Sequence, residues 1–316
     1  MLMDAKKILL FFTLITFLAL LITSCSIDLG KESNSDKNND KDKVFEYPDN
    51  AIVDIPYAEV DGTELLLDIY IPEFPETEIP VVLWVHGGAW SAGDKYAAKN
   101  PAELLTDEGY AVISINYRLR QEALFPAQIH DIKAAVRWLR ANGVEYNLNT
   151  ENIAAAGSSA GGHLVALLGT TNGNEELEGT VGDYLDYSSD VQAIINLFGP
   201  VDFLSLQEDC VGVCRKEYDE SNSAESKLIG CTLSECEDLA NQVSPIYHIS
   251  SDDVPILIIH GDEDTTIPPI QSDRFYQELI NAGVDAELVV AEGFEHDVSM
   301  SLTYMGEIVE FLDVKI

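Results

Sequence analysis

Residues 153–163 read IAAAGSSAGGH, and this short segment decides the fold that we expect. A short apolar run stops at Gly157, and a helix-compatible stretch from Leu164 to Leu168 follows the serine pair. In the pattern G-x-S-x-G, Ser159 has a glycine two positions away on each side, and Gly157 and Gly161 permit a sharp turn. We therefore predict a strand, a turn and a helix, with Ser159 as the candidate nucleophile. A glycine-rich loop that merely contains a serine is the alternative, which the flanking patterns disfavour.

Length and charge limit the classes of protein that fit. At 316 residues the chain suits one large α/β domain or two small ones. Its formal net charge of −37 argues against a nucleic acid partner, because phosphates would be repelled. A polyanionic substrate is disfavoured for the same reason, whereas a neutral ester or polysaccharide is compatible. A salt-rich habitat would produce the same charge balance.

The first 25 residues have the features of a targeting segment. Two lysines precede an apolar run from Ile8 to Ile22, which is too short for a comfortable membrane span. Residues 22–25, Ile-Thr-Ser-Cys, resemble the bacterial lipobox, in which the cysteine is lipidated. We predict a lipoprotein signal peptide over 1–24, lipidation of Cys25, and a protein held outside the cytoplasm on a bacterial membrane. A simple N-terminal anchor is the alternative.

Composition divides the rest of the chain into two parts. Residues 26–43 contain almost no apolar side chains and cannot bury enough surface to fold. We predict a polar tether over 25–43 and one folded domain over 44–316. Within this domain, the acidic region 204–240 is expected to form a cap or loop region.

Apolar segments of two kinds recur in the predicted domain. Residues 52–57 and 65–71 alternate in polarity around a turn at Asp61-Gly62, as antiparallel edge strands do. Near-continuous apolar runs, typical of strands buried on both faces, occupy 81–85, 111–115, 153–156, 191–197 and 256–259. Helical patterns lie between them, for example over 131–141 and 272–282. We predict an α/β fold with a mostly parallel central sheet, antiparallel N-terminal strands and helices on both faces.

Four of the five cysteines fall within one polar stretch. In an oxidising compartment they favour disulfides over a metal site, and no histidine lies among them. The sequence does not determine the pairing. Local bridges that stiffen a loop near the mouth of the site are our expectation for Cys210, Cys214, Cys231 and Cys236.

A serine nucleophile needs a base and a carboxylate that orients the base. After a G-x-S-x-G turn, the acid and then the histidine follow in sequence. The apolar run 256–259 leads into three competing carboxylates, Asp262, Glu263 and Asp264. Of the six histidines, only His296 lies downstream of all three, so we predict that it is the base.

Two other histidines and a second glycine-containing motif can also be interpreted from the sequence. His163 and His260 each adjoin a turn glycine, and we expect both to be structural. The sequence HGGAW at 86–90 follows the strand predicted at 81–85. Its glycines would let main-chain amides approach a reacting oxyanion, although a plain glycine turn is the alternative.

Together, HGGAW and GSSAGG resemble motifs of esterases in the α/β-hydrolase superfamily. The resemblance extends to hormone-sensitive-lipase-like enzymes and, more closely, to the bacterial group of feruloyl and acetyl esterases that act on plant polysaccharides. It covers about residues 50–316, including 125–128 and 198–203. Two features depart from the pattern: Ala89 replaces the third glycine, and 208–220 looks inserted.

The resemblance implies a role for each candidate residue. It selects Asp264 as the acid, with Asp202 as an outside candidate that would otherwise cap a helix or hold a turn. Trp90 is expected either to form a wall of the substrate pocket or to pack in the core. The implied site comprises the nucleophile Ser159, the acid Asp264, the base His296 and the oxyanion amides of Gly87, Gly88 and Ala160.

The expected activity is hydrolysis of carboxylic esters through an acyl-enzyme, without cofactor or metal. Acetyl or feruloyl esters of plant polysaccharides are the substrates that the resemblance implies. A dipeptidase-like serine peptidase is an alternative, although such enzymes usually carry a separate gating domain. A non-catalytic ligand-binding homologue is another, which would predict a broken triad. Action on long-chain lipids would require an apolar lid, and the predicted cap is acidic.

Overall fold

The structure of the protein is a computed structural model that describes residues 47–75, 78–214 and 216–316. The predicted signal peptide over 1–24, the lipidation of Cys25 and the tether to residue 43 lie outside the described residues. No helix within the described ranges is long and apolar enough to cross a membrane.

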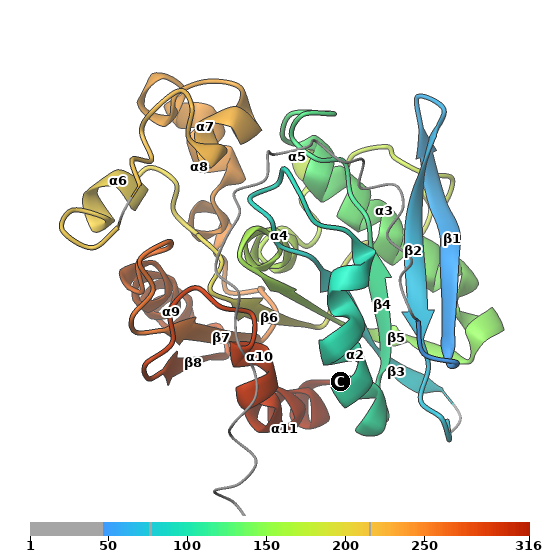
Figure 1. The fold of residues 1–316 in the computed structure, drawn as a ribbon. Coiled ribbons are helices and arrows are strands. Elements are labelled where there is room, and N and C mark those ends of the chain that lie inside the picture. The colour runs from blue at the N-terminus through green and yellow to red at the C-terminus, as the bar shows by residue number, and fades with distance from the viewer. Residues whose placement is uncertain (1–46, 76–77, 215) are drawn as a thin grey trace, which may run out of the picture. The chain divides into compact units, whose positions relative to one another are not determined.

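One eight-stranded sheet organises the described residues (Figure 1), with the strand order β1-β2-β4-β3-β5-β6-β7-β8. The strands are β1 (Ala51–Val60), β2 (Thr63–Tyr70), β3 (Ile79–Val85), β4 (Ala111–Ile115), β5 (Leu148–Ser158), β6 (Ala193–Leu197), β7 (Ile256–Gly261) and β8 (Ala286–Ala291). β2 is antiparallel to both β1 and β4, and every other pair is parallel. This confirms the predicted sheet, except that β2 is an interior strand rather than an edge.

The N-terminal hairpin forms at the expected turn. Val60 pairs with Thr63, which leaves a two-residue loop. Asp61 and Gly62 adopt φ angles of 51° and 81°. Two successive positive φ angles match the right-handed twist of the strands, and Asp-Gly is a favoured pair for such a turn.

Helices cover both faces of the sheet. The α-helices of the described residues are α2 (Lys99–Asp107), α3 (Ala127–Asn142), α4 (Ala160–Gly169), α5 (Glu175–Glu178), α6 (Leu206–Asp209), α7 (Ala224–Ile229), α8 (Glu237–Val243), α9 (Ile270–Ala282), α10 (Met300–Thr303) and α11 (Met305–Lys315). Apolar residues of α3, α4 and α9 share one core cluster, and those of α2, α10 and α11 share the other. Along β5, Ile153 and Ala155 belong to the first cluster, whereas Ala154 and Ala156 belong to the second. Burial on both faces explains why this strand reads as a continuous apolar run.

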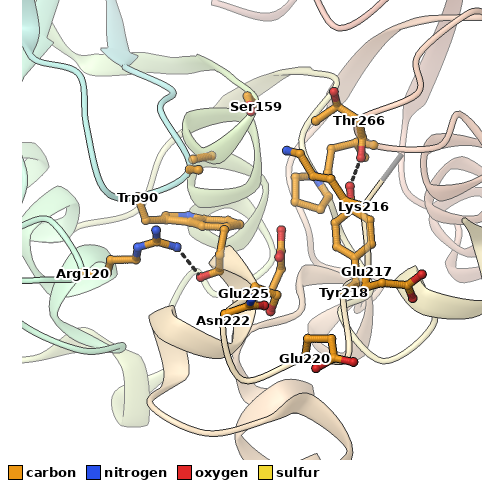
Figure 2. Close-up of a pocket in the computed structure, with 16 residues that line it drawn as sticks. Trp90, Arg120, Ser159, Lys216, Glu217, Tyr218, Glu220, Asn222, Glu225 and Thr266 are labelled. Carbon is orange, nitrogen blue, oxygen red and sulfur yellow. Dashed lines mark hydrogen bonds between the residues drawn. The ribbon is translucent and has the colours of Figure 1, made fainter. Parts of the chain in front are cut away.

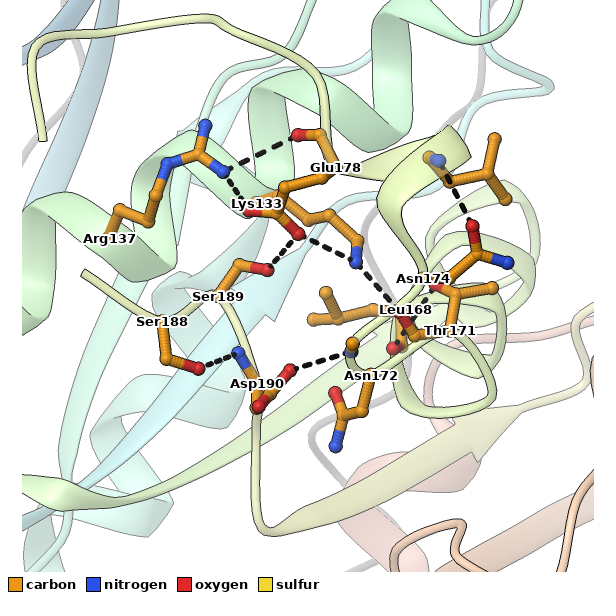
Figure 3. Close-up of polar contacts among 12 residues, drawn as sticks. Lys133, Arg137, Leu168, Thr171, Asn172, Asn174, Glu178, Ser188, Ser189 and Asp190 are labelled. Carbon is orange, nitrogen blue, oxygen red and sulfur yellow. Dashed lines mark hydrogen bonds and ion pairs between the residues drawn. The ribbon is translucent and has the colours of Figure 1, made fainter. Parts of the chain in front are cut away.

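A buried ionic cluster joins α3 to α5 and to the loop before β6 (Figure 3). Lys133 Nζ lies 3.2 Å from a carboxylate oxygen of Glu178, which also pairs with Arg137. The Ser189 hydroxyl donates to the same carboxylate over 2.7 Å, and Lys133 donates to the Thr171 carbonyl over 2.8 Å. Burial alone would raise the pKa of Glu178, but these donors hold it below its usual value. The cluster satisfies two buried cations and fixes the segment that leads into β6.

Residues 204–240, here called the cap, lie between β6 and β7 in sequence. They contain α6, α7 and the start of α8, and Figure 1 shows these helices grouped at the end of the sheet opposite β1 and β2. Two local disulfides, which are those we expected, cross-link the cap. They are Cys210–Cys214 and Cys231–Cys236.

The close approach of α4 to β3 gives a test of the packing. A Cβ on Gly161 would lie 2.0 Å from the Val85 carbonyl oxygen, so Gly161→Ala should lower the free energy of unfolding by roughly 3 kcal/mol. Gly306 in α11 is the control, because a Cβ there meets nothing within 4 Å. Gly306→Ala should stabilise by about 0.5–1 kcal/mol. Urea unfolding measures both, and a Gly161→Ala variant as stable as wild type would contradict this packing.

Candidate active site

Ser159 occupies the sharp turn between β5 and α4. Its backbone has φ 54° and ψ −119°, a conformation that a residue with a side chain rarely adopts. The turn is over-determined by its neighbours: the Ser159 N–H donates to the Leu197 carbonyl, and its carbonyl accepts from the His163 N–H, each over 2.9 Å. A Cβ on Gly157 would lie 2.6 Å from the main chain of Gly161, so neither glycine tolerates a side chain. This local crowding explains the two glycines of the motif.

The structure brings the three side chains of the predicted triad together. Ser159 follows β5, Asp264 follows β7, and His296 follows β8, so all three lie at the carboxyl edge of the parallel strands. His296 Nε2 is 2.8 Å from Ser159 Oγ, and His296 Nδ1 is 2.6 Å from Asp264 Oδ2. A nucleophile, base and acid require this order of contacts, with the imidazole between the hydroxyl and the carboxylate.

Asp264 is buried and is held by several donors. Its Oδ1 accepts hydrogen bonds from the N–H groups of Thr266 and Ile267, over 2.7 and 2.9 Å. Burial by itself would raise the pKa of Asp264, but the hydrogen bonds from His260 and His296 outweigh it and hold the pKa far below its usual range. The carboxylate therefore stays ionised beside the imidazole at any pH near neutrality.

The other candidate acids have different partners. Asp262 Oδ1 accepts a hydrogen bond from the Gly293 N–H over 2.7 Å. Asp202 Oδ1 accepts from the Ser205 N–H over 3.3 Å, and its Oδ2 lies 3.6 Å from Arg274. Asp202 thus holds the turn after β6, which was its alternative role, and of these carboxylates the structure places Asp264 against His296.

His260 and Phe198 support the three side chains from behind. His260 Nε2 lies 3.2 Å from Asp264 Oδ2, so this histidine, expected to be only structural, contacts the acid directly. Its Nδ1 lies 2.6 Å from the Ser272 hydroxyl, which fixes the ring. The Phe198 ring packs edge-on to His296, with centroids 4.7 Å apart. Sequence reasoning did not assign Phe198 a role, although it begins the conspicuous segment 198–203.

The glycines after β3 pass beside the serine. A Cβ on Gly87 would lie 3.3 Å from Ser159 Cβ. Gly88 has φ 112°, and a Cβ there would meet the Ala92 carbonyl oxygen at 2.2 Å. Ala160 is the first residue of α4, where main-chain N–H groups have no acceptor within the helix. The oxyanion role of these three amides remains a prediction.

A cavity of about 610 Å³ opens on Ser159 (Figure 2). One wall is Trp90, which is only 2% exposed and donates its indole N–H to His163 Nδ1 over 3.2 Å. Trp90 therefore both packs in the core and lines the cavity. The cap supplies much of the remaining wall, which sequence reasoning did not resolve into residues. The cap residues are Lys216, Glu217, Tyr218, Glu220, Asn222, Ser223, Ala224 and Glu225.

The fold and the site define an α/β-hydrolase, and the comparisons with known proteins agree. The BD-FAE family matches residues 67–279, and the chain belongs to this family. Esterase LipC of Mycobacterium tuberculosis is 32% identical over 222 residues, which cover 69% of this chain and 53% of LipC. The chain spans about half the length of this and two other curated relatives that it matches.

Two solved structures support the same fold. A truncated form of a carbohydrate esterase from gut microbiota is 34% identical and has a TM-score of 0.77. The match covers 84% of this chain and 95% of that structure. Esterase Est2 of the planctomycete Thermogutta terrifontis is 25% identical, with a TM-score of 0.66 over 84% of this chain and 92% of that structure.

The buried His163 gives a prediction about pH. Burial lowers the pKa of His163 to about 4, and a proton on Nδ1 would face the indole N–H of Trp90. An unfolded histidine titrates near 6.5, so the folded state, which holds His163 neutral, binds this proton less readily than the unfolded state does. The contribution of His163 to the free energy of unfolding is therefore complete above pH 6.5 and decreases as pH falls toward 4. The full loss is roughly 3 kcal/mol. Urea unfolding between pH 7 and pH 5 should therefore show a smaller decrease for His163→Gln than for wild type.

Glutamine is a suitable replacement because it can accept from Trp90 and donate to the Val243 carbonyl, the other partner of His163. Burial also lowers the pKa of His86, but His86 is present in both proteins, so its contribution to the pH dependence cancels in the comparison. An equal dependence on pH in both proteins would show that His163 is not the group responsible.

Proposed function

We propose that the protein is a lipid-anchored, extracytoplasmic serine esterase that hydrolyses carboxylic esters through an acyl-enzyme. The observation that carries this proposal is the continuous set of hydrogen bonds from Ser159 through His296 to Asp264. Acetyl or feruloyl esters of plant polysaccharides are the proposed substrates. The N-terminal lipobox-like sequence is the basis for the proposed location.

The proposed reaction has two halves. Ser159 Oγ attacks the ester carbonyl carbon while His296 Nε2 takes the hydroxyl proton, and the imidazolium returns this proton to the leaving alcohol. Water then attacks the acyl-enzyme, again with His296 as base, and releases the acid and the free serine. Asp264 orients the ring and stabilises its positive charge. The amides of Gly87, Gly88 and Ala160 stabilise the oxyanion in both halves.

Two observations support a carbohydrate ester as the substrate. One is the likeness to a carbohydrate esterase of known structure, which covers nearly all of that chain. The other is the cavity itself, whose cap side presents charged and amide side chains. Such a wall suits a hydroxylated substrate better than a long alkyl chain, which would leave these polar groups unpaired.

Hydrolysis assays on wild type, Ser159→Ala and Ser158→Ala test the proposal. The substrates are p-nitrophenyl acetate, acetylated xylo-oligosaccharides and methyl ferulate. Ser159→Ala should lower kcat by roughly 10⁴-fold or more, because it removes the nucleophile. Ser158→Ala, the same change one residue earlier, should retain most of the activity. Full activity in Ser159→Ala would refute the assignment, and an inactive wild type would favour a ligand-binding homologue.

A further inference from the structure

One buried carboxylate in the wall of the active-site cavity has no part in the triad. Glu225 lies on α7 of the cap and is only 5% exposed, yet it lines the same cavity as Ser159. Figure 2 shows its side chain in the space between Trp90 and Tyr218, the two aromatic walls. Glu217 and Glu220, the other acidic lining residues, are exposed. Of these three carboxylates in the cavity wall, Glu225 is therefore the one that bulk water reaches least.

The position of Glu225 is fixed by its surroundings. Its carboxylate interacts with the main-chain N–H groups of Glu225 and Ala224 at the start of α7. The hydroxyl of Ser223 caps this helix by accepting from the Ser226 N–H over 3.0 Å. Arg120 Nη1 donates to the Ala224 carbonyl over 2.8 Å, which ties α7 to the segment after β4. The acceptor is thus held in place before any substrate arrives.

A buried carboxylate in the cavity wall favours ligands that carry hydrogen-bond donors. An ionised carboxylate has two oxygens that only accept, and together they can take about four hydrogen bonds. Two neighbouring hydroxyls of a sugar ring can donate to the two oxygens at once. Burial raises the pKa of Glu225, while the main-chain N–H groups and the charges of Lys216 and Arg120 oppose this effect. The two main-chain N–H groups fill only part of the capacity of the carboxylate to accept hydrogen bonds, so hydroxyl donors would be favoured and an anionic group rejected.

We propose that Glu225 is a specificity-determining residue that accepts hydrogen bonds from sugar hydroxyls of the ester substrate. This inference depends on the proposed esterase function and assigns a residue to the recognition of its alcohol part. A phenolic hydroxyl on an aromatic acyl group offers the same donor chemistry, and the substrates chosen below separate the two sources.

The test compares wild type, Glu225→Gln and a control, Glu235→Gln. Glu235 is an exposed residue of the same cap, outside the cavity, so the control makes the same change of charge. The substrates are p-nitrophenyl acetate, which has no hydroxyl, acetylated xylotriose, and methyl ferulate paired with methyl 3,4-dimethoxycinnamate, which lacks the phenol. Glu225→Gln should lower kcat/KM for acetylated xylotriose by roughly 10- to 100-fold, mainly through KM. Its p-nitrophenyl acetate hydrolysis should stay within about twofold of wild type, and Glu235→Gln should match wild type throughout.

Other outcomes overturn the proposal. Unchanged kinetics for acetylated xylotriose would do so while leaving the esterase function intact. An equal loss on every substrate would make Glu225 structural, and a loss confined to methyl ferulate would assign the hydroxyl to the phenol.

Binding gives a readout that does not require turnover. Calorimetric titration of acetylated xylotriose into Ser159→Ala should show binding, and adding Glu225→Gln should weaken it roughly 10-fold or more. Equal affinity of the two variants, or no binding to either, would overturn the sugar assignment. The binding measurement tests the sugar assignment even if the protein proves to have no esterase activity.

Discussion

The whole arrangement depends on the turn that places Ser159 at the end of β5. The serine backbone is held at φ 54°, and a Cβ on Gly157 or on Gly161 would lie 2.8 or 2.0 Å from the Val85 carbonyl oxygen. Because the crowding involves main-chain atoms of β3 and α4, the turn is coupled to the packing of the sheet core. A side chain at either glycine would move the helix, the neighbouring strand and the serine together.

The reactivity of Ser159 then depends on the buried carboxylate of Asp264, which orients the base His296. A buried carboxylate such as Asp264 is favourable only if donors replace the lost water, and two main-chain amides and two histidines do so. The acid loop is also joined to the cap, because the Tyr218 hydroxyl donates to the Thr266 carbonyl and the Thr266 N–H donates to Asp264. The residues that shape the cavity and those that orient the base are therefore parts of one hydrogen-bonded structure.

The core of the fold was predictable because its strands are buried on both faces. A continuous apolar run flanked by glycine turns and helical patterns is typical of a buried strand, so β3, β4, β6 and β7 could be predicted from the sequence pattern. The ends of the strands were harder to predict. β5 begins at Leu148 rather than Ile153, and the prediction missed this start because residues 149–152 are polar and partly exposed. The strand extends through them because Leu148 pairs with Ile79, and a register shift follows before Ile153 pairs with Val81.

The residues of the site also fall into those that the sequence predicts and those that it does not. Ser159 and His296 could be located from sequence because chain order and local glycines constrain them, and the resemblance to known esterases was needed to choose Asp264. Glu225 and Tyr218 could not be found, because their position in the cavity follows from how the cap folds back over the sheet. His260 was assigned too small a role, since its contact with Asp264 depends on the shape of the loop between them.

The most direct test of this account is the site of covalent modification by a fluorophosphonate, located by mass spectrometry of peptides. An activated serine should react once per chain, with the added mass on Ser159, and His296→Ala should slow the reaction strongly. Labelling of a different serine, or no labelling of a protein that still turns over esters, would contradict the proposed alignment of hydroxyl, imidazole and carboxylate.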